Sequence, residues 1–120
     1  MSDSTLNVGL LGAGWFGREA HLTNLCGIEG VEPIAASSRS DESLDAAQKI
    51  AGDGLAVTHD WREVLESPEV DAVIIALTND QHHEAAMAAF EAGKHVLCEK
   101  PIGLTLSECN EIIAASKSAD

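Results

Sequence analysis

A glycine-rich segment near the N-terminus has the residue types and spacing of a phosphate-binding loop. The pattern GxGxxG is matched by Gly12-Ala13-Gly14-Trp15-Phe16-Gly17. Gly12 permits a tight turn, Gly14 leaves room for a pyrophosphate, and Gly17 lets the following helix pack closely. Trp15 and Phe16 would offer backbone N–H groups at the helix start, where the helix dipole also favours phosphate. The segment therefore predicts dinucleotide binding, against the alternative of a glycine-rich turn that holds no ligand.

The next polar segment, Ser37-Ser38-Arg39-Ser40, lies about 20 residues beyond the loop, where NAD-binding domains place an acid for the ribose hydroxyls. This segment contains no acid, and the first acid after it is Asp41. Ser38 can donate a hydrogen bond and Arg39 suits a phosphate group, which favours NADP over NAD. The alternative is a solvated arginine at a helix start. The missing acid also disfavours an S-adenosylmethionine methyltransferase, which needs a carboxylate for the same ribose.

One lysine has a position suited to catalysis. Lys100 follows the apolar run 95–98, so it should lie at the carboxyl end of a strand, where doubly wound sheets bind ligands. A cation there can polarise a hydroxyl or carbonyl and stabilise developing negative charge on oxygen. The alternative is a surface lysine paired with Glu99.

These residues need a scaffold, and the sequence alternates strand-like and helix-like segments throughout. Apolar runs predict strands over residues 6–11, 31–37, 55–58, 71–77 and 95–98. Helical patterns follow each run, and Gly52 and Gly93 end two of them. We expect an α/β doubly wound parallel sheet of the Rossmann type, with five strands in the order 3-2-1-4-5.

Polar residues predict where several of the helices begin. Ser40 is a candidate cap for the second helix. The patterns Asp60-x-x-Glu63 and Thr105-x-x-Glu108 predict capping boxes for two others. In the last helix we expect four residues to face inward: Leu106, Cys109, Ile112 and Ile113.

Composition limits the partners and the location of the chain. Its 120 residues suffice for one domain, and 20 acids against 7 bases give a net charge of −13, which argues against nucleic acid and anionic membranes. No apolar stretch approaches the roughly 20 residues of a membrane span, and the polar N-terminus is unlike a signal peptide, so we expect a cytoplasmic protein.

The metal-ligating residue types are scattered rather than clustered. The cysteines Cys26, Cys98 and Cys109 have no metal or redox spacing, so we expect buried reduced thiols. The neighbouring His82 and His83 would diverge on a helix, and we expect no metal site.

Two further segments resemble one enzyme family. VDAVIIALT (residues 70–78) and EAGKHVLCEKP (residues 91–101) are similar to the Gfo/Idh/MocA oxidoreductases. The resemblance implies a nicotinamide cofactor and a sugar, polyol or related carbonyl substrate. It implies that Glu99, Lys100 and Pro101 lie beside the nicotinamide and that the lysine contacts substrate. It also implies cofactor contacts from Thr78, Asn79 and His83, although Asn79 stands where the family has proline.

The same resemblance implies a second, substrate-binding domain that this chain lacks. We therefore expect residues 1–120 to be the cofactor-binding domain of a two-domain oxidoreductase, inactive alone and part of a homo-oligomer. The alternatives are a non-catalytic dinucleotide-binding or sensing module and a structural domain that binds no coenzyme.

Overall fold

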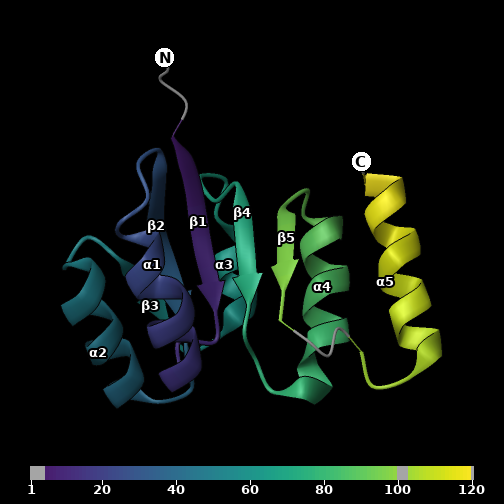
Figure 1. Cartoon of the computed structure of the whole chain (residues 1–120), viewed down its shortest axis with the longest axis horizontal. Coiled ribbons are helices and arrows are strands. Elements are labelled where there is room, and N and C mark those ends of the chain that lie inside the picture. Colours follow the sequence, from purple (N-terminus) through teal and green to yellow (C-terminus); the bar gives the residue numbers. More distant parts are fainter. Residues whose placement is uncertain (1–4, 100–102, 120) are drawn as a thin grey trace.

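A single five-stranded sheet organises the molecule. The computed structural model describes residues 5–99 and 103–119. The strands are β1 (Leu6–Leu11), β2 (Val31–Ser37), β3 (Ala56–Thr58), β4 (Ala72–Ile75) and β5 (His95–Cys98). They are ordered β3-β2-β1-β4-β5, and every neighbouring pair is parallel. The predicted fold class and strand order are confirmed, and all five strands point to one edge of the sheet (Figure 1).

Helices cover both faces of this sheet. Their bounds are η1 (Gly17–Leu22), α1 (Thr23–Leu25), α2 (Asp41–Ala51), α3 (Trp61–Glu66), η2 (Asn79–Gln81), α4 (His82–Glu91) and α5 (Leu106–Ala119). One core joins η1, α1 and α2 to the sheet, and a second core joins α3, α4 and α5 to its other face. β4 serves both cores, because Val73 and Ile75 face one and Ile74 faces the other. This is the doubly covered central strand that its continuous apolar sequence predicts.

The helix caps in the structure match only some of the caps predicted from the sequence. The Ser40 hydroxyl accepts a hydrogen bond from the Ser43 amide, as predicted for α2. Asp60 caps α3 through the Arg62 amide, but Glu63 does not complete the box, because its carboxylate accepts the Thr58 hydroxyl. Glu108 does complete a cap for α5, although it bonds the Leu104 amide, one residue before the expected one.

The packing of α5 and of the cysteines differs from expectation. Ile112 is buried and Cys109 is half-buried, but Leu106 is 77% exposed and Ile113 47% exposed. The reason is that α5 packs along α4 at the end of the layer (Figure 1), which buries a narrower stripe than a sheet would. The prediction of buried thiols is also wrong: Cys26 is exposed in the turn after α1, and Cys98 is half-buried on an edge strand.

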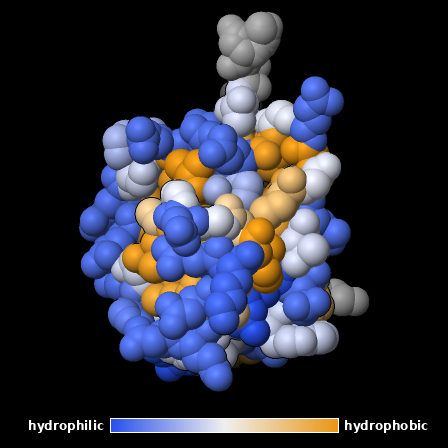
Figure 2. Space-filling view, turned by 90° about the vertical axis from the view of Figure 1, so that its left-hand side faces the viewer, coloured by the Kyte–Doolittle hydropathy of each residue, from blue (hydrophilic) through white to orange (hydrophobic). Residues whose placement is uncertain are grey.

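One side of the molecule is mainly polar. Hydrophilic residues cover most of the side that carries α2 and β3, with hydrophobic residues showing between them (Figure 2). Among the described residues, no helix combines the length and the apolar character required to cross a bilayer.

Candidate cofactor-binding site

The glycine loop is fastened to the carboxyl end of the neighbouring strand. The Ser37 carbonyl accepts hydrogen bonds from the Gly12 amide at 3.1 Å and the Ala13 amide at 2.7 Å. The Ser37 hydroxyl also accepts the Gly12 amide at 3.3 Å, and Ser37 is only 2% exposed. Ser37 therefore positions the loop. This role was not predicted from the sequence, where Ser37 is marked only by its place directly before Ser38 and Arg39.

The three glycines of the motif differ in whether the fold itself requires them. Gly12 has a φ of +100°, and a Cβ there would lie 2.4 Å from the Ala76 carbonyl oxygen. A Cβ at Gly17 would lie 2.1 Å from the Gly12 carbonyl oxygen. A Cβ at Gly14 would meet no described atom within 4 Å. The fold therefore dictates Gly12 and Gly17, whereas Gly14 leaves an open approach to the loop that a ligand can use.

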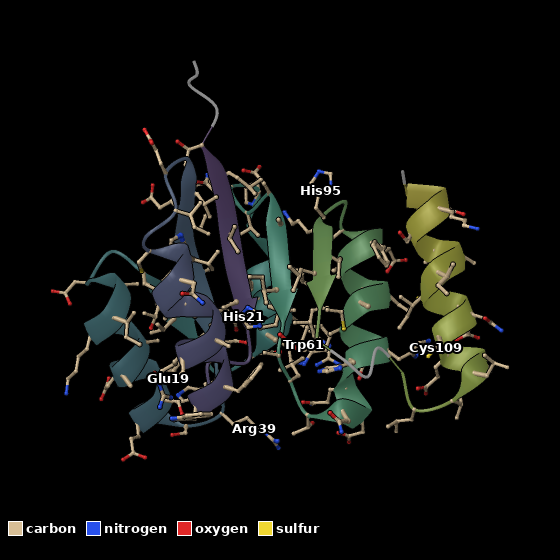
Figure 3. All side chains as sticks on the ribbon, in the orientation of Figure 1. Glu19, His21, Arg39, Trp61, His95 and Cys109 are labelled. Carbon is tan, nitrogen blue, oxygen red and sulfur yellow. The ribbon has the colours of Figure 1, made fainter. Side chains whose placement is uncertain are left out.

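A pocket of about 420 Å³ lies at this edge of the sheet. Five of the predicted site residues line it: Gly12, Gly14, Ser38, Arg39 and Thr78. The lining residues that were not predicted as part of the site are Ser37, Ser40, His59, Asp60, Trp61, Arg62, Ala76, Leu77 and Gln81. Arg39 lies at the edge toward which the strands point, and His95 lies at the opposite edge (Figure 3).

Ser38 and Arg39, the two residues predicted to contact the 2′-phosphate, line this pocket. The Ser38 amide donates to the Thr58 carbonyl at 3.1 Å, the Ser38 hydroxyl accepts the Ser40 amide at 3.4 Å, and the residue is half-buried. Arg39 is exposed, and within residues 5–99 and 103–119 it forms no ion pair. Its charge is therefore available for an anionic ligand.

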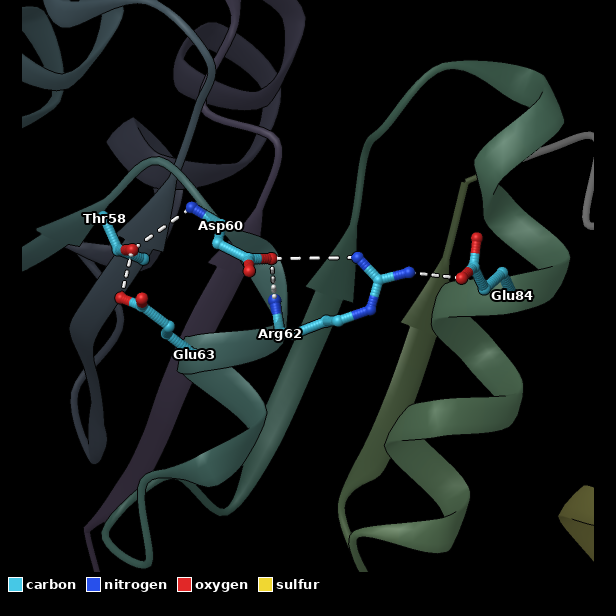
Figure 4. Close-up of polar contacts among 5 residues, drawn as sticks. All are labelled: Thr58, Asp60, Arg62, Glu63 and Glu84. Carbon is cyan, nitrogen blue, oxygen red and sulfur yellow. Dashed lines mark hydrogen bonds and ion pairs between the residues drawn. The ribbon is translucent and has the colours of Figure 1, made fainter.

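A second arginine lines the pocket but is already neutralised. The Arg62 guanidinium contacts the Glu84 carboxylate and lies 3.8 Å from the Asp60 carboxylate (Figure 4). The same guanidinium stacks 4.3 Å from the Trp61 ring centroid. The Asp60 amide is held in turn by the Thr58 hydroxyl. These residues follow directly after β3 at the ligand-binding edge, and that position is the signal that would have identified them.

The segment after β4 contributes only part of what was expected. The Thr78 hydroxyl donates to the Gln81 side-chain oxygen at 3.1 Å, and both residues line the pocket. Asn79 begins η2 and is exposed outside the pocket lining. His83 Nε2 lies 2.7 Å from the Glu111 carboxylate of α5, so the structure does not bring it to the pocket.

The remaining predicted residues lie around the helix start and the end of β5. Trp15 and Phe16 are 70% and 51% exposed and do not line the pocket. The Glu99 carboxylate lies 2.5 Å from His21 Nε2. Burial, and then the negative charge of Glu99, raise the pKa of Cys98 to about 11, so this thiol stays protonated at neutral pH. Lys100 lies outside the described residues.

Other parts of the surface are less suited to a dinucleotide. A larger hollow of about 560 Å³ lies between β2, β3 and α3, but Glu32, Glu63 and Glu69 line it. Three carboxylates would repel phosphate groups, so we place the site at the glycine loop instead. In the part of the chain that the structure describes, no three His, Cys, Asp or Glu residues are grouped to hold a metal ion.

The sheet order, the glycine loop at the β1/β4 switch point and the pocket beside it define a Rossmann-type dinucleotide-binding domain. Residues 6–120 match the oxidoreductase family with an NAD-binding Rossmann fold, so the chain belongs to the Gfo/Idh/MocA oxidoreductases.

The chain is similar to one part of several longer oxidoreductases of this family. The chain is 39% identical over 111 residues to 1,5-anhydro-D-fructose reductase of Ensifer adhaerens, covering 92% of this chain and 33% of that protein. It superposes on apo scyllo-inositol dehydrogenase of Lactobacillus casei with a TM-score of 0.90 and 31% identity, covering 99% of this chain and 35% of the other. For KijD10, a 3-ketoreductase of Actinomadura kijaniata solved with NADP, the TM-score is 0.87 and the identity 26%, over 96% and 35% of the two chains. The chain thus spans about a third of the length of its relatives.

Proposed function

We propose that this chain binds NADP(H) along the carboxyl edge of its sheet and serves as the cofactor domain of a sugar or polyol oxidoreductase. One observation carries the proposal: the open loop at Gly14 and the ion-pair-free Arg39 line the same pocket. The loop amides and the start of the following helix suit a pyrophosphate, and Ser38 and Arg39 suit a 2′-phosphate beside it. NADP bound to KijD10 supports this choice, with NAD as the alternative.

The proposed activity of the whole protein is hydride transfer, which the nicotinamide supplies when bound. In that protein Lys100 would polarise the substrate hydroxyl or carbonyl. The relatives include a reductase of 1,5-anhydro-D-fructose and a dehydrogenase of scyllo-inositol, which supports a sugar-like or polyol substrate.

Because 120 residues cover about a third of such proteins, we propose that a separate substrate domain supplies the remaining groups and that this chain alone is inactive. A non-catalytic dinucleotide-binding module would bind the same cofactor but would show no hydride transfer in any longer form.

The first prediction concerns cofactor choice. We expect wild type to bind NADPH about tenfold more tightly than NADH, a difference of about 1.4 kcal/mol, because Arg39 is exposed and the net charge of −13 opposes an added phosphate. Arg39→Ala should remove most of this preference with little effect on NADH. Ser38→Asp combined with Arg39→Ala should invert it, because the new carboxylate accepts the ribose hydroxyls and repels phosphate. Fluorescence titrations of the three proteins with both cofactors measure this. Equal weakening of both cofactors by Arg39→Ala would refute the assignment to the 2′-phosphate.

The second prediction concerns self-association. Leu97, Leu104, Leu106 and Ile113 are about half or more exposed around the β5 edge and α5. Exposed apolar groups and an open strand edge favour association, so we expect this chain to form homo-oligomers at high concentration. Sedimentation velocity should show a dimer or larger species whose population falls when Leu97 and Ile113 are both changed to Ser. A monomer across the whole concentration series would contradict the prediction.

We also propose a cytoplasmic location. All three cysteines are free, and Cys26 is exposed, which suits a reducing compartment.

A further inference from the structure

We propose that His21 is a positioning residue, acting through Glu99 to fix the part of the site that receives the nicotinamide half of the cofactor. This inference rests on the proposed function and deepens it, because it concerns a residue outside the glycine motif.

The observation is a side-chain contact that joins two distant segments. His21 Nε2 lies 2.5 Å from Glu99 Oε2, across 78 positions of sequence. The two side chains are only 15% and 27% exposed, so water competes weakly for the contact. A half-buried carboxylate needs a hydrogen-bond donor, and an imidazole N–H supplies one. The pair therefore connects the helical segment after the glycine loop to the end of β5.

Local structure fixes the imidazole side of this contact. His21 lies in η1, which is a π-helical turn rather than the α-helix expected from the sequence. A π-turn changes the direction of its side chains, and such turns are frequent at functional sites. The ring also packs edge-on against Phe16, with centroids 5.8 Å apart and an interplanar angle of 81°. The Thr23 hydroxyl donates to the Arg18 carbonyl at 3.0 Å and so helps to end this turn.

The backbone fixes the carboxylate side. The Glu99 amide donates to the Ile75 carbonyl at 3.0 Å, which continues the β4–β5 ladder one residue beyond β5. Glu99 is thus held at the ligand-binding edge while its side chain reaches toward η1. His21 lies on the helical segment in front of the sheet (Figure 3).

The position of the pair relative to the cofactor follows from the topology. In a doubly wound sheet the dinucleotide crosses the switch point, with one half on each side of the loop. Ser38 and Arg39 follow β2, so the adenosine half belongs on that side. The other half must then lie toward the ends of β4 and β5, where His21 and Glu99 meet. Without His21, the Glu99 carboxylate would lose its donor and could turn toward the anionic cofactor.

The test separates the two halves of the ligand. NADPH and 2′-phospho-ADP-ribose share the phosphates and the adenosine, but only NADPH carries nicotinamide. We expect His21→Leu to weaken NADPH binding about tenfold and 2′-phospho-ADP-ribose binding less than twofold. His21→Gln, which retains an N–H donor, should restore most of the NADPH affinity. His95→Leu, a matched change at the opposite edge of the sheet, should alter neither ligand.

A double-mutant cycle checks that the effect passes through Glu99. Adding Glu99→Ala, which removes the acceptor, to His21→Leu should cost much less than the sum of the two single changes. The positioning role is overturned if His21→Leu leaves NADPH affinity unchanged, or if it weakens both ligands equally. Binding of neither ligand by the wild-type chain would instead overturn the proposed function, and this inference with it. If His21→Leu impairs folding, His21→Ala, which removes the donor without adding apolar volume, replaces it in both tests with the same expected results.

Discussion

Gly14→Ala should nearly abolish cofactor binding while leaving the stability of the domain unchanged. No described atom lies within 4 Å of the added methyl group, and Gly14 does not have a positive φ, so the fold tolerates alanine there. The methyl group would occupy the space through which the pyrophosphate approaches the loop amides. We expect NADPH affinity to fall at least thirtyfold, or about 2 kcal/mol, which lies within the range for a steric overlap in a packed site.

A matched control is available at the other edge of the sheet. Gly54 also has open space around its Cα, and it precedes β3 far from the loop. Gly54→Ala makes the same chemical change and should alter neither stability nor NADPH affinity. Isothermal titration and thermal melting of both variants give the comparison. An unchanged NADPH affinity in Gly14→Ala would show that no phosphate approaches this loop.

Gly17→Ala should have the opposite profile, with a large loss of stability. The added Cβ would lie 2.1 Å from the Gly12 carbonyl oxygen, which belongs to the backbone and cannot rotate away. Helix propensity alone would make alanine more favourable than glycine by about 1 kcal/mol. The sign of the change in unfolding free energy therefore distinguishes a backbone clash from a simple gain in helix propensity. We expect the free energy of unfolding to fall by about 3 kcal/mol or more, a large part of the stability of a small domain. Urea denaturation measures it, again with Gly54→Ala as control, and an equal or higher unfolding free energy in Gly17→Ala would contradict the packing described here.

The architecture of this chain was predictable because its signals are local and repeated. Each strand is a short apolar run, and β4 is apolar on both faces, which indicates a central parallel strand. GxGxxG directly after β1 then placed the switch point. Predictions failed for two different reasons. Glu63 had more than one partner within reach and bonds Thr58 rather than completing its cap. Leu106 has no sheet to pack on and stays exposed.

The candidate site was predictable only where a motif marks it. Gly12 and Gly14 of the loop, together with Ser38 and Arg39, line the pocket as their positions after β1 and β2 required. Ser37 and the His21–Glu99 contact were not predictable, because they depend on how segments far apart in the sequence are brought together and on a π-turn that no residue pattern announces. The placements of Asn79 and His83 depended on a family motif that this chain alters at Asn79.

The most direct test of the central claim is a fluorescence titration of the wild-type chain with NADPH and with NADH. Saturable binding of both, with NADPH about tenfold tighter and competed by 2′-phospho-ADP-ribose, is the result that the open loop and the free charge of Arg39 predict. No saturable binding of either cofactor to the folded chain at millimolar concentration would contradict it.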